Sequence, residues 1–420
     1  MAETGGETGG GLRECRVERL NRAGEGVATG GAGESAVTVP FALPGELVRG
    51  AVSDGVLRPE RILEPSPERV TPPCRHFGTC GGCALQHASD GFLTGWKRRM
   101  VETALARRGL AAVFRPVATS PIRSRRRASF AGRRTRKTVQ TGFHARRSEA
   151  VVDIEECPLI RPELLEAKPL LAAATALGAA RGGTIRLALT VSEGGLDLDV
   201  SEAKPLDAKG LSEAARLAES GDLARLSWNG ETVALRRPPW QAFGPARVTP
   251  PPGGFLQATA EGQTTLTAAV REAVGSARRI ADLFAGCGTF SLPLARAAEV
   301  HAVENSAPAL AALDQGWREA QGLRRVTTER RDLFSRPLLG PELARFEAVV
   351  MDPARAGAEA QARALAGSDV PRIAMVSCDP VTFARDVAIL AEGGYRIDWV
   401  QVVDQFRWSG HVEIVAALSR

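Results

Sequence analysis

The sequence contains no long hydrophobic run. None of its apolar stretches approaches the roughly 18 residues that span a bilayer. The first residues, Met-Ala-Glu-Thr-Gly-Gly, have neither the basic segment nor the apolar segment of a secretory signal. We therefore expect a cytoplasmic protein that does not engage a membrane.

Cysteine and lysine are both scarce. Seven cysteines, an odd number in a long cytoplasmic chain of 420 residues, do not suggest a disulfide framework and favour metal ligation or catalysis. Lys and Arg together number 54, of which only five are Lys. Arginine, whose planar fork suits phosphate groups and base stacking, therefore carries nearly all of the positive charge.

The rest of the composition is that of an ordinary globular protein. Hydrophobic residues make up 44% of the chain and charged residues 24%, and the length predicts two to three domains. Residues 1–150 contain 25 Lys and Arg against 14 Asp and Glu, whereas residues 151–420 contain 29 against 34. The front of the chain is therefore basic and the back is not.

The first two segments are a tail and a barrel. Residues 1–11, rich in Gly, Thr and Glu, predict a disordered tail. Residues 12–66 predict a small closed β-barrel of the OB type, because short candidate strands alternate with turn residues. The candidate strands are Cys15–Asn21, Gly26–Thr29, Ala36–Phe41, Glu46–Ser53 and Val56–Leu63.

Residues 67–257 predict an α+β central domain. It opens with a Pro-, Gly- and Cys-rich loop and continues with an amphipathic helix over residues 94–109, a candidate to pack on the domain that follows. A very basic strand segment, 124–137, comes next, with further strands at 138–144 and 150–154.

Residues 258–420 alternate regularly between strand and helix patterns. This alternation predicts a doubly wound, mostly parallel α/β sheet, and the last two strands, with no helix between them, predict an antiparallel hairpin. The expected strands are 279–284, 299–304, 324–330, 346–351, 372–377, 396–403 and 411–418, and the expected helices 259–275, 289–298, 306–321, 357–367 and 381–392.

A glycine loop, Asp282-Leu-Phe-Ala-Gly286-Cys-Gly288-Thr-Phe, lies between a strand and a helix of this pattern. A dinucleotide fingerprint needs a third glycine to hold a pyrophosphate, and Ser291 stands there instead. With Glu304 at the end of the next strand, the loop suits a ligand that has a ribose diol but no pyrophosphate. S-adenosylmethionine is such a ligand.

Two further patches follow strands and should face the same crevice. They are Met351-Asp352-Pro-Ala-Arg-Ala-Gly357 and Val376-Ser377-Cys378-Asp-Pro380. Methylation of an amine needs no nucleophilic cysteine. Methylation of C5 of a pyrimidine does use one, because a thiolate that adds at C6 makes C5 nucleophilic. A base must then remove the C5 proton, and Glu413 in Asp404-Gln-Phe-Arg-Trp-Ser-Gly-His-Val-Glu413 is the candidate, while we interpret His411 as structural.

Four cysteines have the spacing of a metal site. Cys74, Cys80 and Cys83 form a Cys-x5-Cys-x2-Cys segment, and Cys157 follows later with Pro158 behind it. Zinc and iron–sulfur clusters both accept four thiolates. Structural zinc is the commoner occupant, whereas the Cys-Pro end favours a ferredoxin-type cluster, so the spacing leaves both open.

Together these elements resemble the TRAM-domain uracil-C5 RNA methyltransferases, and most closely the bacterial enzymes that form 5-methyluridine in 23S rRNA. The resemblance spans nearly the whole chain. It is carried by Val39-Pro-Phe-Ala-Leu-Pro-Gly-Glu46, the segment from Cys74 to His87, residues 282–294, 352–357 and 377–380, and Gly410-His-Val-Glu413.

The resemblance implies a fold and a set of functional residues. It implies an OB-like TRAM barrel, a central iron–sulfur domain and a Rossmann-like domain that binds S-adenosylmethionine, with Cys378 as nucleophile and Glu413 as base. By the same similarity Cys74, Cys80, Cys83 and Cys157 hold a [4Fe-4S] cluster. The cofactor contacts carry over to Gln257, Phe284, Gly286, Gly288, Thr289, Glu304, Asp332 and Asp352.

This sequence departs from the family pattern at three places. The usual Ser-Cys-Asn-Pro reads Ser-Cys-Asp-Pro, and the carboxylate of Asp379 could disfavour the thiolate beside it. The usual Gln-x-Asn reads Gln257-Ala-Thr259, and the usual Phe-Pro-x-Thr reads Phe406-Arg-Trp-Ser409. None of the three removes a catalytic group.

The densest basic run predicts how RNA is held. It consists of Arg123, Arg125, Arg126, Arg127, Arg133, Arg134, Arg136 and Lys137, with Phe130 and Phe143 nearby. A solvated strand face is the alternative interpretation. We expect a monomer that methylates C5 of a uridine in structured RNA, 23S rRNA in the first place. The alternatives are a tRNA uridine-C5 methyltransferase, an N-methyltransferase and an inactive RNA-binding iron–sulfur protein.

Overall fold

The chain forms two compact units. The computed structural model describes residues 12–29 and 35–420, so the tail expected over residues 1–11 lies outside the described range. The first unit contains the described residues up to Trp96 together with Trp408–Gly410, and the second contains Lys97–Arg407 and His411–Arg420. No helix within the described ranges is long and apolar enough to cross a bilayer. The domain boundaries expected at residues 66 and 257 stay predictions.

The first unit is built on a six-stranded sheet in the order β1-β5-β6-β4-β3-β2. Its strands are β1 (Leu12–Arg16), β2 (Arg19–Leu20), β3 (Gly26–Ala28), β4 (Val37–Val39), β5 (Leu47–Ser53) and β6 (Val56–Glu64). The two edge strands, β1 and β2, are separated in the chain by only Val17 and Glu18, so one bent segment pairs with β5 at one edge and with β3 at the other. Val39, Val48 and Leu57 are fully buried in the core of this sheet.

Glu46 fastens the cysteine-containing loop to this sheet. Its buried carboxylate accepts hydrogen bonds from Arg69 Nε at 2.6 Å and Nη2 at 2.8 Å, and from the backbone N–H groups of Leu43 and Ser66. Burial alone raises the pKa of Glu46, but these hydrogen bonds outweigh it, and the net pKa is lowered. The carboxylate is therefore charged and bonded on both oxygens.

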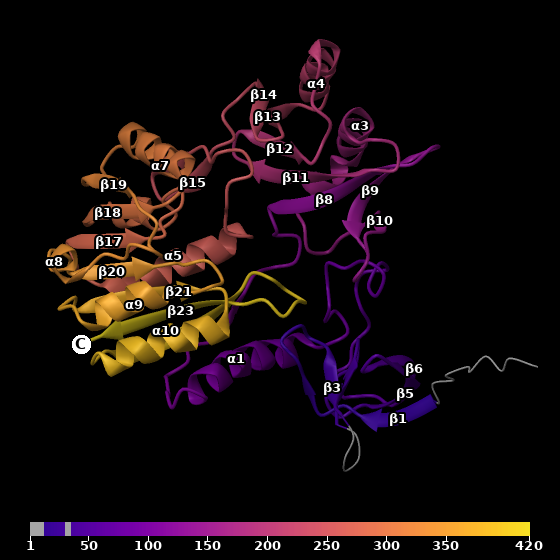
Figure 1. Cartoon of the computed structure of the whole chain (residues 1–420), viewed down its shortest axis with the longest axis horizontal. Coiled ribbons are helices and arrows are strands. Elements are labelled where there is room, and N and C mark those ends of the chain that lie inside the picture. The colour runs from indigo at the N-terminus through magenta and orange to yellow at the C-terminus, as the bar shows by residue number, and fades with distance from the viewer. Residues whose placement is uncertain (1–11, 30–34) are drawn as a thin grey trace, which may run out of the picture. The chain divides into compact units, whose positions relative to one another are not determined.

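A seven-stranded sheet forms the first part of the second unit (Figure 1). Its order is β10-β9-β8-β11-β12-β13-β14, antiparallel except for the pair β12 and β13. The strands are β8 (Arg127–Arg134), β9 (Val139–His144), β10 (Val151–Asp153), β11 (Thr184–Ser192), β12 (Gly195–Ser201), β13 (Leu223–Trp228) and β14 (Glu231–Leu235). The helices of this part are α2 (Pro162–Glu166), α3 (Lys168–Gly178) and α4 (Ala208–Ser220), and a short hairpin, β15 (Gln241–Phe243) and β16 (Ala246–Val248), follows.

An eight-stranded sheet carries the rest of the second unit. Its order is β19-β18-β17-β20-β21-β23-β22-β7, and every strand runs in the same direction except β23. The strands are β7 (Ala118–Thr119), β17 (Arg279–Leu283), β18 (Glu299–Glu304), β19 (Val326–Arg330), β20 (Ala348–Met351), β21 (Arg372–Ser377), β22 (Arg396–Asp404) and β23 (Glu413–Ser419). The doubly wound α/β prediction, with its final antiparallel pair, is confirmed.

Helices bury both faces of this sheet, which explains why its central strand β20 is hydrophobic at every position. Val349 and Met351 point into one cluster with residues of α1, α8, α9 and α10, whereas Ala348 and Val350 point into another with residues of α5, α6 and α7. Figure 1 shows α5, α9 and α10 running alongside the strands. The helices are α1 (Asp90–Ala106), α5 (Ala260–Val274), α6 (Ser291–Leu294), α7 (Ala307–Glu319), α8 (Gly340–Leu343), α9 (Glu359–Ala366) and α10 (Pro380–Glu392).

Local chemistry explains where these elements differ from the expected ones. Helix α1 begins four residues before the expected Thr94 because Ser89 Oγ accepts a hydrogen bond from the Phe92 N–H and so caps the first turn. The helix expected over 289–298 is reduced to the single turn α6, which contains Pro293. Strand β7 pairs over only two residues, too few for a periodic pattern.

A buried ion pair connects α1 to the end of β22. Lys97 Nζ donates to Asp404 Oδ1 at 2.5 Å and to the carbonyl oxygen of Phe406 at 3.0 Å. The side chains of Lys97 and Asp404 are 0% and 4% exposed. Burial lowers the pKa of Lys97, and the charge of Asp404 opposes that shift.

We predict that Lys97→Ala destabilises the protein by about 3–5 kcal/mol, because it leaves the Asp404 carboxylate buried without its partner. The neighbouring surface pair, Arg98 with Glu102, is largely exposed, so Arg98→Ala should cost less than about 1 kcal/mol. Urea unfolding of the two variants and the wild type measures both effects. Equal losses for both variants would contradict the buried-pair assignment.

Candidate active site

The order of the eight-stranded sheet reverses between β17 and β20. From β17 the sheet continues to β18 and β19 on one side, and to β20 and β21 on the other. Ligands of open α/β sheets bind beyond the carboxyl ends of the strands at such a switch point. The residues that follow these strands include Phe284, Glu304, Asp352 and Cys378, all selected from the sequence.

The glycine loop follows β17 in a conformation that few residues adopt. Phe284, Gly286 and Gly288 all have positive φ angles, of 63°, 54° and 91°. A Cβ at Gly288 would lie 2.8 Å from Leu313 Cγ, so glycine is required there by space as well as by φ. A Cβ at Gly286 would meet nothing within 4 Å. The loop is therefore tightly packed at Gly288 and open at Gly286.

Carboxylates surround this open side of the loop. Glu304 accepts hydrogen bonds from the N–H groups of Gly286 at 3.1 Å and of Asn305 and Ser306 at 2.8 Å each. Asp332 accepts from Phe334 N and Ser335 Oγ, and these hydrogen bonds lower its pKa. The half-exposed ring of Phe334, which the sequence reasoning missed, lies 5.4 Å from the ring of Phe284. The feature of the sequence that could have identified Phe334 is an aromatic residue two positions after Asp332.

Cys378 and Glu413 lie at the same edge of two paired strands. Cys378 follows β21 and Glu413 begins β23, and the antiparallel register pairs Ser377 with Ile414. The next step of this register sets residue 378 opposite residue 413. Two residues that are 35 positions apart in the sequence are therefore neighbours.

Burial and mutual repulsion raise the pKa values of the acids of this site. Burial, and secondarily the charges of Glu413 and Asp352, raise the pKa of the Cys378 thiol to about 11, against an opposing effect of Arg355. Burial, with Asp352 as the second cause, raises the pKa of Glu413 well above its usual range. The pKa of Asp352 is raised to about 7 by burial and by Asp282. A positive charge placed among these groups lowers all three pKa values.

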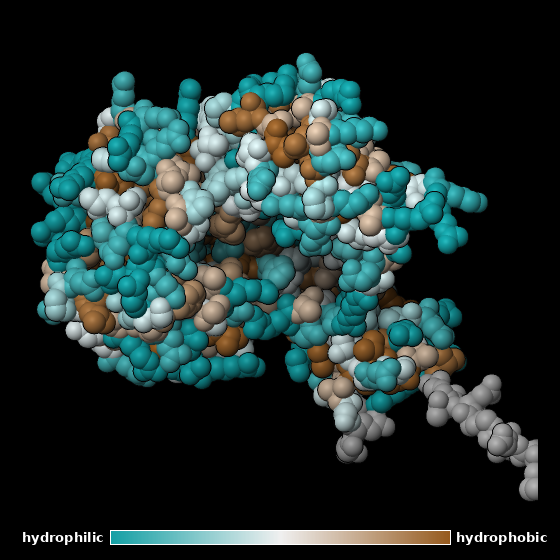
Figure 2. Space-filling model, turned by 45° about the horizontal axis from the view of Figure 1, so that its top comes forward, coloured by the Kyte–Doolittle hydropathy of each residue, from teal (hydrophilic) through white to brown (hydrophobic). Residues whose placement is uncertain are grey.

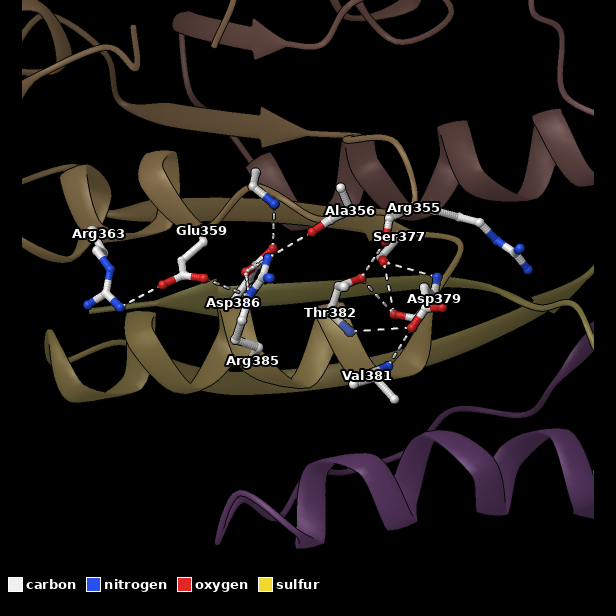
Figure 3. Close-up of polar contacts among 11 residues, drawn as sticks. Arg355, Ala356, Glu359, Arg363, Ser377, Asp379, Val381, Thr382, Arg385 and Asp386 are labelled. Carbon is white, nitrogen blue, oxygen red and sulfur yellow. Dashed lines mark hydrogen bonds and ion pairs between the residues drawn. The ribbon is translucent and has the colours of Figure 1, made fainter. Parts of the chain in front are cut away.

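The Asp379 carboxylate is occupied as a helix cap. Its Oδ1 accepts hydrogen bonds from the N–H groups of Val381 at 2.8 Å and Thr382 at 3.4 Å, at the start of α10 (Figure 3). Burial, Glu413 and Asp352 are the main causes that raise the pKa of Cys378. The Asp379 carboxylate is engaged with the backbone of α10, and its effect on the thiolate stays a prediction.

Arg355 and His411 form a pair near Cys378. Arg355 Nη2 lies 2.9 Å from His411 Nδ1, and the carbonyl oxygen of Arg355 accepts a hydrogen bond from Thr382 Oγ1 at 3.1 Å. Figure 3 shows the Arg355 side chain extending away from the Asp379 and Thr382 contacts. Sequence reasoning recorded Arg355 only as part of a motif and gave it no role.

A buried polar network surrounds Gln257. The Gln257 side chain accepts a hydrogen bond from Gln405 Nε2 at 2.5 Å, and its backbone carbonyl accepts one from Arg126 Nε at 3.1 Å. Arg126 also donates to the side chains of Gln241 and Gln263. Thr259, which replaces the family's usual asparagine, caps α5 by accepting the Gly262 N–H at 2.9 Å. Gln405 was not selected from the sequence.

Comparisons with known proteins agree with this geometry. The profile of the family described as tRNA (uracil-5-)-methyltransferase matches residues 251–420. An uncharacterized RNA methyltransferase of Brucella suis is 47% identical to this chain over 407 residues, which are 97% of this chain and 98% of the relative. The 23S rRNA (uracil(1939)-C(5))-methyltransferase RlmD of Chromohalobacter salexigens is 36% identical over 96% of this chain and 88% of that enzyme. The chain belongs to the RNA (uracil-5-)-methyltransferase family.

A solved structure shows the same fold for this methyltransferase. It is the Pyrococcus abyssi tRNA (uracil-54, C5)-methyltransferase in complex with S-adenosyl-L-homocysteine, which superposes with a TM-score of 0.74. The match covers 96% of this chain and 99% of the other at 23% sequence identity. At that identity the likeness concerns the fold alone.

The basic run of the methyltransferase contains both buried and exposed residues. Arg126 is 5% exposed, Arg127 donates to the carbonyl oxygens of Gly253 and Gly254, and Phe130 is buried against Phe143 at 4.9 Å. The expectation that the whole run grips RNA is therefore wrong for these residues, which organise the interior. Arg134 at the end of β8 and Arg136 and Lys137 in the turn that follows are exposed, and this turn projects at the right of Figure 2 among hydrophilic side chains.

The four selected cysteines belong to different units of the methyltransferase. Cys74, Cys80 and Cys83 lie in the first unit and Cys157 in the second. Cys74 is buried and the other three are partly exposed. Within residues 12–29 and 35–420, no group of three or more His, Cys, Asp or Glu side chains is arranged to hold a metal ion.

We predict that alkylation of Cys378 by iodoacetamide is slow near pH 8 and rises about tenfold per pH unit toward pH 10, because only the thiolate reacts and its pKa is about 11. Glu413→Gln removes a negative charge that raises this pKa, so alkylation at pH 9 should be several times faster. Mass spectrometry of the Cys378 peptide measures both rates. Glu392→Gln, at the far end of α10, is the matched control and should leave the alkylation rate of Cys378 unchanged. Fast alkylation that does not depend on pH would contradict the raised pKa of Cys378.

Proposed function

We propose that this chain methylates C5 of a specific uridine in structured RNA, with S-adenosylmethionine as methyl donor and Cys378 as a covalent nucleophile. The observation that carries the proposal is the register of β21 and β23, which sets Cys378 beside Glu413 at the edge of the sheet where β17, β20 and β21 end. A nucleophile and a base in adjacent positions are what carbon methylation of a pyrimidine requires, because C5 of uracil is too weak a nucleophile on its own.

The residues at the switch point fit S-adenosylmethionine. Gly286 leaves open space in the loop, and Glu304 and Asp332 offer carboxylates to a ribose diol, as the acid after the second strand does in dinucleotide folds. Phe284 and Phe334 add apolar rings beside the loop. Gln257, Gly288, Thr289 and Asp352 complete the contacts that the family resemblance implies. When bound, S-adenosylmethionine supplies the methyl group and a sulfonium charge.

Cys378 and Glu413 then divide the reaction between them. The Cys378 thiol first loses its proton to water, and the sulfonium charge favours this loss by lowering the pKa of the thiol. Cys378 Sγ then forms a bond to C6 of the uracil, and the displaced electron pair makes C5 nucleophilic. The new C5–methyl bond forms as the methyl–sulfur bond of the donor breaks. Glu413 takes the proton from C5, and the bond between C6 and Cys378 Sγ breaks to restore the ring. The raised pKa of Glu413 suits a carboxylate that must accept a weakly acidic carbon-bound proton.

We assign 23S rRNA as the substrate and tRNA as the alternative. The assignment is supported by the relative RlmD, whose 36% identity extends over 96% of this chain. An RNA enzyme must extrude its target base, at a cost of a few kcal/mol, and exposed cations such as Arg134 and Lys137 supply phosphate contacts. We propose that the enzyme acts as a monomer.

We predict that 5-fluorouridine-containing 23S rRNA, incubated with S-adenosylmethionine and the full chain purified without oxygen, forms a stable adduct on Cys378 that carries the transferred methyl group. Fluorine cannot leave C5 as a proton, so the bond to Cys378 cannot be released. A denaturing gel and mass mapping of the crosslinked peptide detect the adduct. Parallel reactions with 5-fluorouridine tRNA decide the substrate class, since the preferred RNA is modified at the lower concentration.

Two variants make this test decisive. Cys378→Ala should form no adduct and lose methylation by at least about a thousandfold, whereas Cys287→Ala, a buried cysteine of the glycine loop, should still form the adduct. Methylation of natural RNA by Cys378→Ala would exclude the covalent mechanism and favour N-methylation. Binding of RNA without any methyl transfer by the wild type would favour an inactive RNA-binding protein.

We also propose that Cys74, Cys80, Cys83 and Cys157 hold a [4Fe-4S] cluster in a central domain of residues 67–257, between a TRAM-type barrel (12–66) and the methyltransferase domain (258–420). A set of four thiolates suits soft metals such as zinc and iron, and the Cys-Pro at residues 157–158 is typical of ferredoxin-type ligation. The arrangement of β1 and β2 at both edges of the first sheet supports the barrel.

We predict about four iron and four sulfide per chain in protein purified without oxygen. Cys80→Ser and Cys157→Ser should each reduce the iron content strongly, whereas Cys15→Ala, in the core of the first sheet, should leave it unchanged. Metal analysis and visible absorption measure the content. Stoichiometric zinc in colourless protein would overturn the cluster in favour of a zinc site.

A further inference from the structure

Gln405 is a buried amide whose bonds all lead to the active site. It is 3% exposed and lies between the end of β22 and the start of β23. Its Oε1 accepts the Thr259 N–H at 3.4 Å, its Nε2 donates to Gln257 Oε1 at 2.5 Å, and its side chain hydrogen-bonds the Glu413 carboxyl.

These bonds fix the orientation of the amide. Thr259 offers a backbone N–H, so the Gln405 oxygen must point toward it, and the NH2 group must then face the other two partners. An NH2 group carries two hydrogens, which match the two acceptors, Gln257 Oε1 and the Glu413 carboxylate. The carbonyl oxygen and both hydrogens of the Gln405 amide therefore have hydrogen-bond partners.

The packing around Gln405 also leaves it little freedom. A Cβ at Gly262, in the first turn of α5, would lie 2.7 Å from Gln405 Oε1 and 3.0 Å from its Cβ. Thr259, which binds Gln405 through its N–H, is itself held by a hydrogen bond between its Oγ1 and Ser120 Oγ at 2.7 Å. The first turn of α5 thus packs directly against the Gln405 amide.

We propose that Gln405 is a positioning residue that orients Glu413 for removal of the C5 proton and joins it to Gln257 on the cofactor side of the site. The inference rests on the proposed function. A donated hydrogen bond points one carboxylate oxygen in a fixed direction and favours the ionised form that accepts the proton. The groups that act against ionisation are the Asp352 carboxyl and the apolar surroundings, and the Cys378 thiol and Arg355 lie beside them.

The proposal separates the two halves of the reaction. Formation of the Cys378 adduct and methyl transfer do not need Glu413, whereas proton removal and release do. Loss of Gln405 should therefore slow release without equally slowing methyl transfer. An amide with a purely structural role would slow both steps or neither.

The experiment uses single-turnover methylation of natural RNA by Gln405→Met, with the covalent complex and the released product followed on denaturing gels. Methyl transfer should stay within about twofold of the wild type while adduct breakdown slows about tenfold, the usual effect of losing one hydrogen bond to a charged group. The defect should narrow as pH rises, because the variant raises the pKa of Glu413 and higher pH restores its ionised form.

Gln401→Met is the matched control, since Gln401 lies on β22 shortly before Gln405 and donates to the carbonyl oxygen of Pro116 instead. If Gln405→Met fails to fold, as judged by circular dichroism and its unfolding midpoint, Gly262→Ala tests the same point by displacing the amide without removing it. Breakdown as fast as in the wild type in the folded variant would overturn the inference. Absence of any adduct with 5-fluorouridine RNA in the wild type would instead overturn the proposed function.

Discussion

The antiparallel pairing of β21 with β23 is the constraint on which the candidate site depends. In a fully parallel sheet the start of one strand lies at the opposite edge from the end of its neighbour. Because β23 runs against the others, its first residue lies at the edge where β21 ends, and Glu413 is brought to Cys378. The placement of β23 between β21 and β22 also leaves the segment from Gln405 to Glu413 as the connection at this edge. One reversed strand therefore supplies a carboxylate, the base of the proposed mechanism, to an edge that parallel strands alone line with loop residues.

Burial determines the chemical state of that crevice. Asp282, Asp352, Glu413 and Cys378 all have pKa values raised mainly by burial, and each carboxylate that ionises makes the next ionisation harder. Each carboxyl thus opposes ionisation of its neighbours, and one positive charge placed among them would relieve several repulsions at once. In an exposed cleft the three carboxyls would be ionised at neutral pH, whereas the Cys378 thiol would stay mostly protonated. The helices that pack on both faces of the sheet therefore help to set the charge of this site.

Most of the eight-stranded sheet and the main catalytic candidates could be predicted from the sequence, for physical reasons that differ between residues. Alternating strands and helices leave strong periodic signals, so β17 to β23 fall close to their expected positions. Cys378 and Glu413 could be selected because their chemistry is rare and their motifs are local. Gln405 could not be selected, since a glutamine after a strand has no distinctive pattern and two of its partners, Thr259 and Gln257, are more than 140 residues away in the chain.

The arginines also show what the sequence alone cannot predict. Arg126 and Arg134 have identical side chains in one basic run, yet one bonds Gln257, Gln241 and Gln263 in the interior and the other is exposed at a turn. Charge counting cannot distinguish them, because the difference arises only when β8 pairs with β11 and faces the start of α5. The cysteine spacing has a similar limit, since it identifies four thiols but does not show whether they lie close together in the fold.

The cap formed by Asp379 has a consequence for how this enzyme can evolve. Aspartate and asparagine are equally good residues at the N-terminus of a helix, and the oxygen that accepts the Val381 N–H is present in both. Exchange between them leaves α10 and the backbone of Cys378 where they are. Position 379 can therefore drift between related lineages although it adjoins the nucleophile, whereas Gly288, enclosed by Leu313 and Leu292, cannot. Adjacency to a reactive atom and selective constraint are separate properties in this site.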